Sequence, residues 1–158
     1  MLASLSGGIP VSYHVHLGNA AFFLAPGMPN QYFDLVAKAA VEDRGSWAWL
    51  TAWPEPCGEK GPTPRYEALH AELVRETADF VCFDADRIEK SDHDEFAHIQ
   101  VGLVVLGMRA EEAIALARRF RQHEILVGNY GNPPILISCT AKKAGRAERR
   151  RQKLRVVP

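Results

Sequence analysis

Two stretches of the chain place polar side chains where neighbouring strands are expected to end. Trp53 and Glu55 follow one aromatic stretch, and Gln122 and His123 come directly before another apolar run. Because the ends of adjacent strands often line a crevice, these four side chains are candidates for one small pocket. A carboxylate, an amide and an imidazole could serve a small enzyme, although no further motif specifies its class. The structural alternative is that Trp53 caps the core while Gln122 and His123 cap carbonyl groups of the preceding helix.

Histidines offer a second kind of chemistry, metal binding. His14 and His16 share one face of an expected strand, and His93 and His98 lie within or beside a run of acidic residues. Imidazole nitrogens and carboxylate oxygens are common ligands of divalent metals. The same pattern is typical of the wet face of a strand and of a solvated loop, and no cysteine or histidine pair has a zinc-type spacing. We therefore predict no metal site and no cofactor, and keep these histidines only as weak candidates.

Cys57 offers a third, thiol chemistry. It follows a strand and precedes a proline-started helix, which is superficially the placement of a thioredoxin-type thiol. A reactive thiol needs a lowered pKa and usually a resolving partner. The chain has no Cys-x-x-Cys pair, and Glu55 would raise the pKa of the thiol. A loop cysteine without a role is the favoured interpretation, and a thiol enzyme is the alternative.

The C-terminal segment has the strongest charge signal. Residues 142–155 contain eight basic residues and one glutamate, a net charge of +7, whereas the remainder carries 11 basic and 18 acidic residues. The basic residues are Lys142, Lys143, Arg146, Arg149, Arg150, Arg151, Lys153 and Arg155. Such a segment can neutralise phosphates, and the absence of interleaved aromatic residues argues against base stacking. The alternative is a solubilising end that contacts only its own acidic body.

Length and composition indicate one ordinary globular domain. The chain has 158 residues, 47% of them hydrophobic and 24% charged, which is enough for a core without metal or disulfide support. Three cysteines without paired spacing favour reduced thiols. The sequence lacks the charged start of a signal peptide and any apolar run near the roughly 20 residues that span a bilayer. We predict a cytoplasmic protein with no membrane partner.

Hydrophobic periodicity predicts strands and helices in a mixed order. The expected strands are residues 11–17, 20–25, 46–53, 79–84, 103–106, 125–127 and 135–139. The expected helices follow an Asn30 cap, follow a Thr63 cap with Pro64 in the first turn, and run over 113–120. In the aromatic strand, Trp47, Trp49, Thr51 and Trp53 should share one face. The acidic residues of 84–95 are expected in an exposed loop.

This element order predicts the fold class. Several connections are too short for helical crossovers, so pure parallel winding is excluded. We predict an α/β domain of the α+β type, in which about three helices cover a single mixed, largely antiparallel sheet. The domain should span residues 11–139, preceded by a loose leader at 1–10 and followed by a basic, disordered tail at 140–158.

Two motifs resemble the domain-of-unknown-function 3293 family of small bacterial proteins. They are WAWLTAWPEP at 47–56 and VLGMRAEEAIALARRFRQHEIL at 105–126, and the resemblance covers about residues 20–138. This chain departs from the family pattern at Pro54, at Gln100 or Val101, and after Gln122. Only Thr51, Trp53 and Gln122 carry over from its polar positions, so Thr51 joins the candidate pocket. The resemblance implies the fold and no activity.

The sequence therefore favours a non-enzymatic binding or adaptor module. Its basic tail is predicted to engage nucleic acid, such as RNA, or an acidic protein. The alternative is a small enzyme with its site near Trp53 and Gln122, or a thiol enzyme that uses Cys57.

Overall fold

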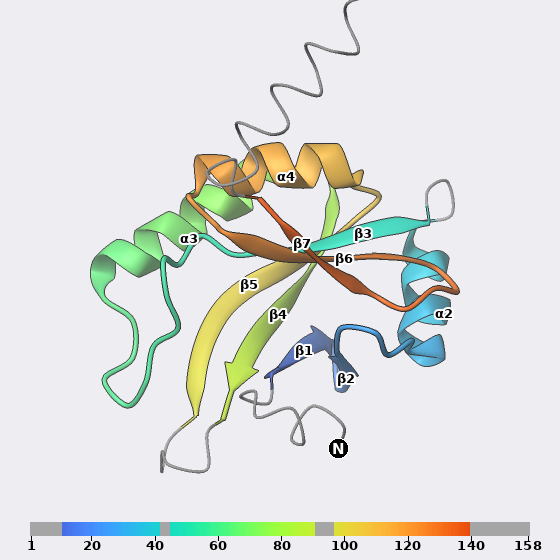
Figure 1. Ribbon diagram of the computed structural model, residues 1–158, viewed down its shortest axis with the longest axis horizontal. Helices are drawn as coiled ribbons and strands as arrows, with labels where there is room; N and C mark the ends of the chain where they lie inside the picture. Colours follow the sequence, from blue (N-terminus) through green and yellow to red (C-terminus); the bar gives the residue numbers. More distant parts are fainter. Residues whose placement is uncertain (1–10, 42–44, 91–96, 140–158) are drawn as a thin grey trace, which may run out of the picture.

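The computed structural model describes residues 11–41, 45–90 and 97–139, which form one antiparallel sheet and three helices (Figure 1). The strands are β1 (Val11–Leu17), β2 (Ala20–Leu24), β3 (Ser46–Leu50), β4 (Val81–Glu89), β5 (His98–Leu106), β6 (Glu124–Asn129) and β7 (Ile135–Ser138). The helices are α2 (Gln31–Ala40), α3 (Pro64–Glu76) and α4 (Ala110–Arg119). The predicted α+β fold with a largely antiparallel sheet is confirmed. The predicted leader and basic tail lie outside the described residues.

The sheet curls so that its two edge strands approach each other. Its strand order is β2-β1-β4-β5-β3-β6-β7, with antiparallel pairing throughout the described strands. The backbone N–H of Gly27, just after β2, donates to the carbonyl of Pro134, just before β7, at 2.7 Å. This bond links the two edges, and the sheet takes the shape of a half-barrel.

Strict alternation along the strands divides the core between the two faces of the sheet. The inner face carries Tyr13, Val15, Trp47 and Trp49, on which Phe33 of α2 packs. A second cluster lies between the outer face of the sheet and the two helices α3 and α4 that cover it. It includes Ala48, Leu50, Leu73, Leu103, Val105, Ala113, Leu116, Ala117, Ile125 and Val127. A sheet buried on both faces explains why its central strands read as nearly continuous apolar runs.

Glycines on neighbouring strands make room for the inner tryptophans. A Cβ added at Gly102 would collide with the Leu50 carbonyl and the Trp49 indole, and one at Gly128 would collide with the Trp47 indole. The Trp49 indole N–H donates to the Ala85 carbonyl at 2.9 Å. The large aromatic rings therefore lie directly on the backbone of the sheet, which fixes their positions.

The helix starts agree with the predicted caps. The Asn30 side chain accepts a bond from the Phe33 N–H at 3.0 Å, and the Thr63 hydroxyl accepts one from the Tyr66 N–H at 3.2 Å. No described helix is both long enough and apolar enough to cross a bilayer.

Two strand predictions were wrong. Residues 84–89 form part of β4 rather than a loop, because the strand pairs with β1 and β5 along this length. Residues 91–96 of that predicted loop lie outside the described part of the chain. The predicted strand at 46–53 ends at Leu50, after which the chain leaves the regular ladder.

Candidate functional site

Beyond β3 the chain continues along β5 as an irregular segment, residues 51–57, which a few isolated hydrogen bonds hold in place. The Thr51 hydroxyl donates to the Val101 carbonyl at 2.6 Å and accepts from the Trp53 N–H at 3.1 Å. Cys57 then pairs with Ile99 through two backbone bonds of 2.7 and 2.8 Å. Because Pro54 and Pro56 lack N–H groups, a regular ladder cannot form between these points. Thr51 therefore fixes the backbone, and its side chain lines none of the three pockets described below.

The Trp53 carbonyl joins three parts of the chain. It accepts a bond from the Gln100 amide at 2.7 Å and another from the Gln122 amide at 3.0 Å. Gln122 also donates to the Phe120 carbonyl at 3.2 Å, as the helix-capping alternative predicted. Both glutamine side chains are buried, with exposed fractions of 6% and 7%. These amides replace ladder bonds that the proline-containing segment cannot make.

Arg121 brings Gln122 into this position. Its φ of 57° places it in the left-handed region just after α4, where glycine is the usual residue. The N–H of Arg121 donates to the Arg118 carbonyl at 3.0 Å, and the N–H of Gln122 to the Ala117 carbonyl at 2.9 Å. This is the Schellman arrangement of helix ends, and it turns Gln122 back under α4.

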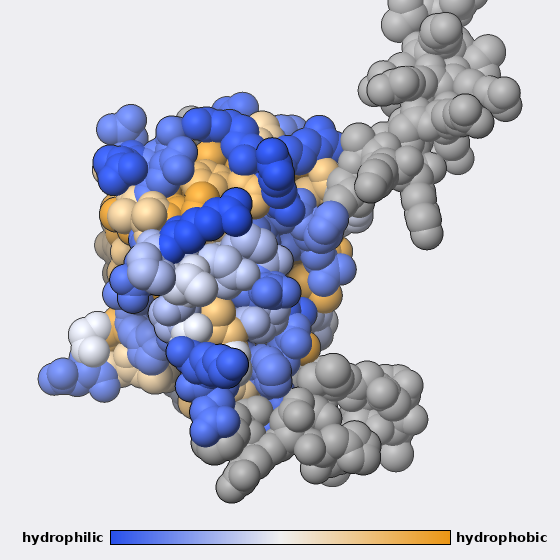
Figure 2. Space-filling view, turned by 90° about the vertical axis from the view of Figure 1, so that its left-hand side faces the viewer, coloured by the Kyte–Doolittle hydropathy of each residue, from blue (hydrophilic) through white to orange (hydrophobic). Residues whose placement is uncertain are grey.

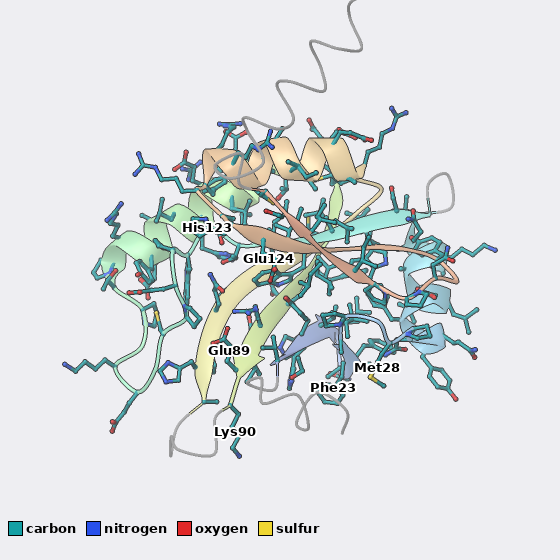
Figure 3. The ribbon with its side chains drawn as sticks, viewed as in Figure 1. Phe23, Met28, Glu89, Lys90, His123 and Glu124 are labelled. Atoms are coloured by element: carbon teal, nitrogen blue, oxygen red, sulfur yellow. The ribbon has the colours of Figure 1, made fainter. Side chains whose placement is uncertain are left out.

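Three of the predicted site residues line one pocket of about 190 Å³ at the end of the inner face. We call it the amide pocket, and its lining includes Tyr13, Trp49, Glu55, Arg87, Gln100, Gln122, His123 and Glu124. Figure 3 shows His123 and Glu124 where β6 begins. Glu55, Gln122 and His123 therefore line one pocket, whereas Trp53 reaches this region through its backbone carbonyl only, so the four predicted side chains do not share a single pocket.

Two further polar groups of the amide pocket, Tyr13 and Arg87, are paired with each other. Arg87 is hydrogen-bonded to the Tyr13 hydroxyl and forms an ion pair with Glu89. Burial raises the pKa of Tyr13 above its ordinary value, against the opposing charge of Arg87, with smaller contributions from Glu124 and Glu89. Tyr13 thus stays a neutral hydroxyl near pH 7. A small polar molecule in this pocket would lie beside the His123 imidazole and the Glu124 carboxylate.

Tyr13, Arg87 and Gln100 were not predicted as site residues. Gln100 was visible as a polar residue entering an apolar strand, which often marks a buried hydrogen bond. Arg87 was hidden because its stretch was assigned to a loop.

The side chain of Trp53 lies in a different pocket, on the outer side of the sheet. This tryptophan pocket has a volume of about 500 Å³ and is lined by Trp53, Cys57, Pro62, Glu67, His70, Asp86, Ile99 and Val101, with Gly58 and Gly61. The prediction that Trp53 shares a face with Trp47 and Trp49 was wrong, because the chain leaves the ladder after Leu50.

Cys57 lines the tryptophan pocket as a free thiol. Burial, and secondarily the charge of Glu55, raises the pKa of this thiol above its ordinary value. His70 lines the same pocket. A raised thiol pKa lowers the thiolate fraction near neutral pH, which disfavours nucleophilic chemistry.

The histidines considered for metal binding have other neighbours. His14 forms a 2.8 Å hydrogen bond with Ser12 and packs edge-on against Phe23, and His16 lies 3.7 Å from Asp86. Burial, followed by the charge of His16, lowers the pKa of His14. In the ranges that the structure describes, no three His, Cys, Asp or Glu side chains form a group suited to a metal ion. His98 packs against Gly58, and His93 lies outside the described residues.

A third hollow, of about 490 Å³, lies between the start of α3 and the end of α4. We call it the arginine hollow; Arg65, Arg119 and Arg121 line it together with Glu72 and apolar side chains. Arg119 forms a two-bond pair with Glu76, at 3.1 and 2.9 Å, which lowers the pKa of that glutamate. Arg118, the residue before Arg119 on α4, donates from Nε to the Cys139 carbonyl at 2.7 Å. The described chain thus ends at a residue held to α4, and the eight predicted tail residues lie beyond it.

Searches with this chain found no matching protein-family model, curated protein or solved structure. The resemblance to the domain-of-unknown-function 3293 family stays a prediction.

Proposed function

We propose that this protein is a binding module whose basic C-terminal segment, together with the arginine hollow, engages the phosphate backbone of nucleic acid. The observation that supports the proposal is the bond from Arg118 to the Cys139 carbonyl, which holds the last described residue before the segment to α4, the helix that also carries Arg119.

Charge distribution supports this proposal. The segment carries eight basic residues and one glutamate, and three arginines line the hollow, whereas the chain outside the segment has more acidic than basic residues. Arginine suits phosphate because its planar guanidinium donates two parallel hydrogen bonds. Binding would be directed at the backbone, since residues 142–155 contain no aromatic side chain on which a base could stack. RNA is the nucleic acid we expect, and an acidic protein is the competing partner.

The test uses the full chain with all eight basic tail residues changed to glutamine. Binding to fluorescent RNA and DNA strands is measured over a range of salt concentrations. Wild type should bind with a strong salt dependence, and the variant should bind about 100-fold more weakly with a shallower slope, because each lost phosphate contact removes counterion release. Changing Arg65 and Arg121 to glutamine should weaken binding by a smaller factor.

A body variant with Lys38, Lys60 and Lys90 changed to glutamine is the charge control, because these three lysines are exposed outside the hollow. It should bind almost as well as wild type. Equal binding by wild type and the tail variant, or tail-dependent capture of an acidic protein without nucleic-acid binding, would refute the proposal.

The amide pocket supports a second candidate, a small enzyme of unassigned class. Its basis is that Glu55, Gln122 and His123 share one pocket with Tyr13 and Arg87. A screen of small polar molecules should then shift backbone amide signals of residues 122–124, and His123→Asn should weaken the response. A thiol enzyme that uses Cys57 is disfavoured by the raised thiol pKa. Rapid alkylation of Cys57 near neutral pH would restore that alternative.

A further inference from the structure

Helix α2 has a second apolar face, which the described part of the chain leaves exposed. Its buried residues, Phe33 and Ala37, pack on the inner side of the sheet. Four more apolar residues recur at the i, i+3, i+4, i+7 spacing and are all exposed: Tyr32, Leu35, Val36 and Ala39. Such spacing is typical of the face that a helix buries against a partner. Within the described chain this stripe has no such partner.

Two side chains near the end of β2 extend the stripe. Phe23 is 61% exposed and Met28 is 66% exposed, and Tyr32 and Leu35 are 76% and 67% exposed. The Asn30 side-chain amide donates to the Phe23 carbonyl at 3.0 Å, which holds β2 to the start of α2. Figure 3 shows Phe23 and Met28 close to this end of the helix. We call the whole set the α2 patch: Phe23, Met28, Tyr32, Leu35, Val36 and Ala39.

The opposite side of the molecule has a different surface. Figure 1 shows α2 and α3 on opposite sides of the sheet, and Figure 2 shows the α3 side, where hydrophilic side chains separate the apolar ones. Exposed Val74, Val81 and Ile99 come one each from α3, β4 and β5. Single exposed apolar residues are common on any protein, whereas a continuous patch marks an interaction surface.

The size of the α2 patch fits an interface between two copies of the chain. With about 200 Å² for each large side chain when fully exposed, the patch offers on the order of 600 Å² of apolar surface. A standard interface buries about 800 Å² on each partner, and roughly 65% of this area is apolar in homodimers. The patch therefore supplies the apolar area that a stable dimer needs.

Charge and symmetry indicate a second copy as the partner. In a two-fold symmetric contact, each side chain near the axis meets its own copy, so a charged residue there would be repelled. The stripe contains no charged residue, and the two charges of α2, Asp34 and Lys38, are opposite in sign. A helix that binds a membrane surface would instead have several lysines or arginines beside its apolar face.

We propose that the protein forms a symmetric dimer in which the α2 patches of two copies pack together with their α2 helices antiparallel. The two-fold axis passes near Leu35 and Val36. Tyr32 and Ala39 lie equally far from this point along the helix, so each tyrosine ring packs over the alanine of the other copy. The interface lies on α2, whereas the arginine hollow lies between α3 and α4, so the dimer does not depend on the proposed function.

Sedimentation of the full-length protein over a range of concentrations tests the dimer. Wild type should convert from monomer to dimer at roughly micromolar concentration, which interfaces of this size commonly reach. Leu35→Glu places two like charges near the axis and should weaken association by more than about 100-fold. Val74→Glu is the matched control, because it adds the same charge at an exposed apolar position on α3, and it should dimerise as wild type does.

A mixture of two variants tests the symmetry of the contact. Leu35→Glu and Leu35→Lys should each be monomeric alone, and an equimolar mixture should form a heterodimer, because the axis then brings opposite charges together. Recovery in the mixture also shows that both variants fold, and it supports the proposal. Three results would overturn it: a wild type that stays monomeric at its highest soluble concentration, a dimer that Leu35→Glu leaves unchanged, and a mixture that stays monomeric.

Discussion

One residue, Trp53, contributes to two regions that treat polar groups in opposite ways. At the amide pocket its carbonyl accepts two bonds, from Gln100 and Gln122, and Arg87 is paired with Tyr13 and Glu89. At the tryptophan pocket its indole N–H is buried and unpaired, and His70 Nδ1 is in the same state. The paired network gains rigidity from its internal bonds, whereas the unpaired groups carry a desolvation cost that no hydrogen bond offsets.

This difference implies that mutations which break the paired or tightly packed groups cost more stability than mutations of the unpaired groups. The largest expected effect comes from Gly102→Ala. The added Cβ meets the Leu50 carbonyl and the Trp49 indole, and Trp49 is held by its bond to Ala85. Because neither neighbour can move freely, we expect a loss of about 3 kcal/mol in the free energy of unfolding, measured with urea.

Gly58→Ala is the matched control for Gly102→Ala. Its added Cβ would meet only a side chain, the half-buried His98 ring, at 3.3 Å, so a shift of a few tenths of an ångström relieves the contact. The loss in the free energy of unfolding should be much smaller than for Gly102→Ala. Equal losses in the two variants would mean that the inner side is no more tightly packed than the loop.

The glutamine pair should show the next largest effect, and its signature is non-additivity. Gln100→Leu and Gln122→Leu should each cost about 1 kcal/mol, because the Trp53 carbonyl keeps one partner in either variant. The double variant leaves that buried carbonyl without a side-chain donor. Its loss should exceed the sum of the single losses by about 1 kcal/mol, as a double-mutant cycle of urea unfolding would measure. Strict additivity would show that the two amides act independently.

Two tryptophans allow the same comparison with identical chemistry. Trp49→Phe and Trp53→Phe remove the same atoms, but only the Trp49 N–H has a partner, the Ala85 carbonyl. Trp49→Phe should therefore be the more destabilising variant, by about 1 kcal/mol in urea unfolding. A larger loss for Trp53→Phe would mean that its indole N–H is hydrogen-bonded in solution.

The sequence predicted the parts of this comparison that depend on local pattern. Alternation and caps identified the strands and the starts of two helices, because burial and capping are read residue by residue. Glu55, Gln122 and His123 line one pocket because both stretches lie at strand ends, but the fourth predicted member, the Trp53 side chain, lies in another pocket. The face of Trp53 was not predictable, because it depends on where β5 and β6 stop pairing with β3.

The charged half of β4 was missed for a related reason. Asp84 and Asp86 alternate with Phe83 and Ala85, which is a strand pattern, but the density of acidic residues favoured a loop. Only the pairing with β1 and β5 decides between the two readings, and pairing between distant segments is not encoded in any single window.

Asp86 gives the smallest expected effect and a pH test of the tryptophan pocket. Burial raises the pKa of Asp86, His16 opposes the increase, and Asp84 adds to it. An acid whose pKa is higher in the folded state contributes stability below its unfolded pKa and loses this contribution as pH rises through the folded value. Asp86→Asn should therefore become more stable relative to wild type as pH rises above the ordinary aspartate range. His16→Gln should lose more stability than wild type over the same rise in pH, because His16 opposes the increase in the pKa of Asp86. Urea unfolding at a series of pH values measures both effects, and a constant difference between wild type and Asp86→Asn across pH would contradict the raised pKa of this partly buried carboxyl.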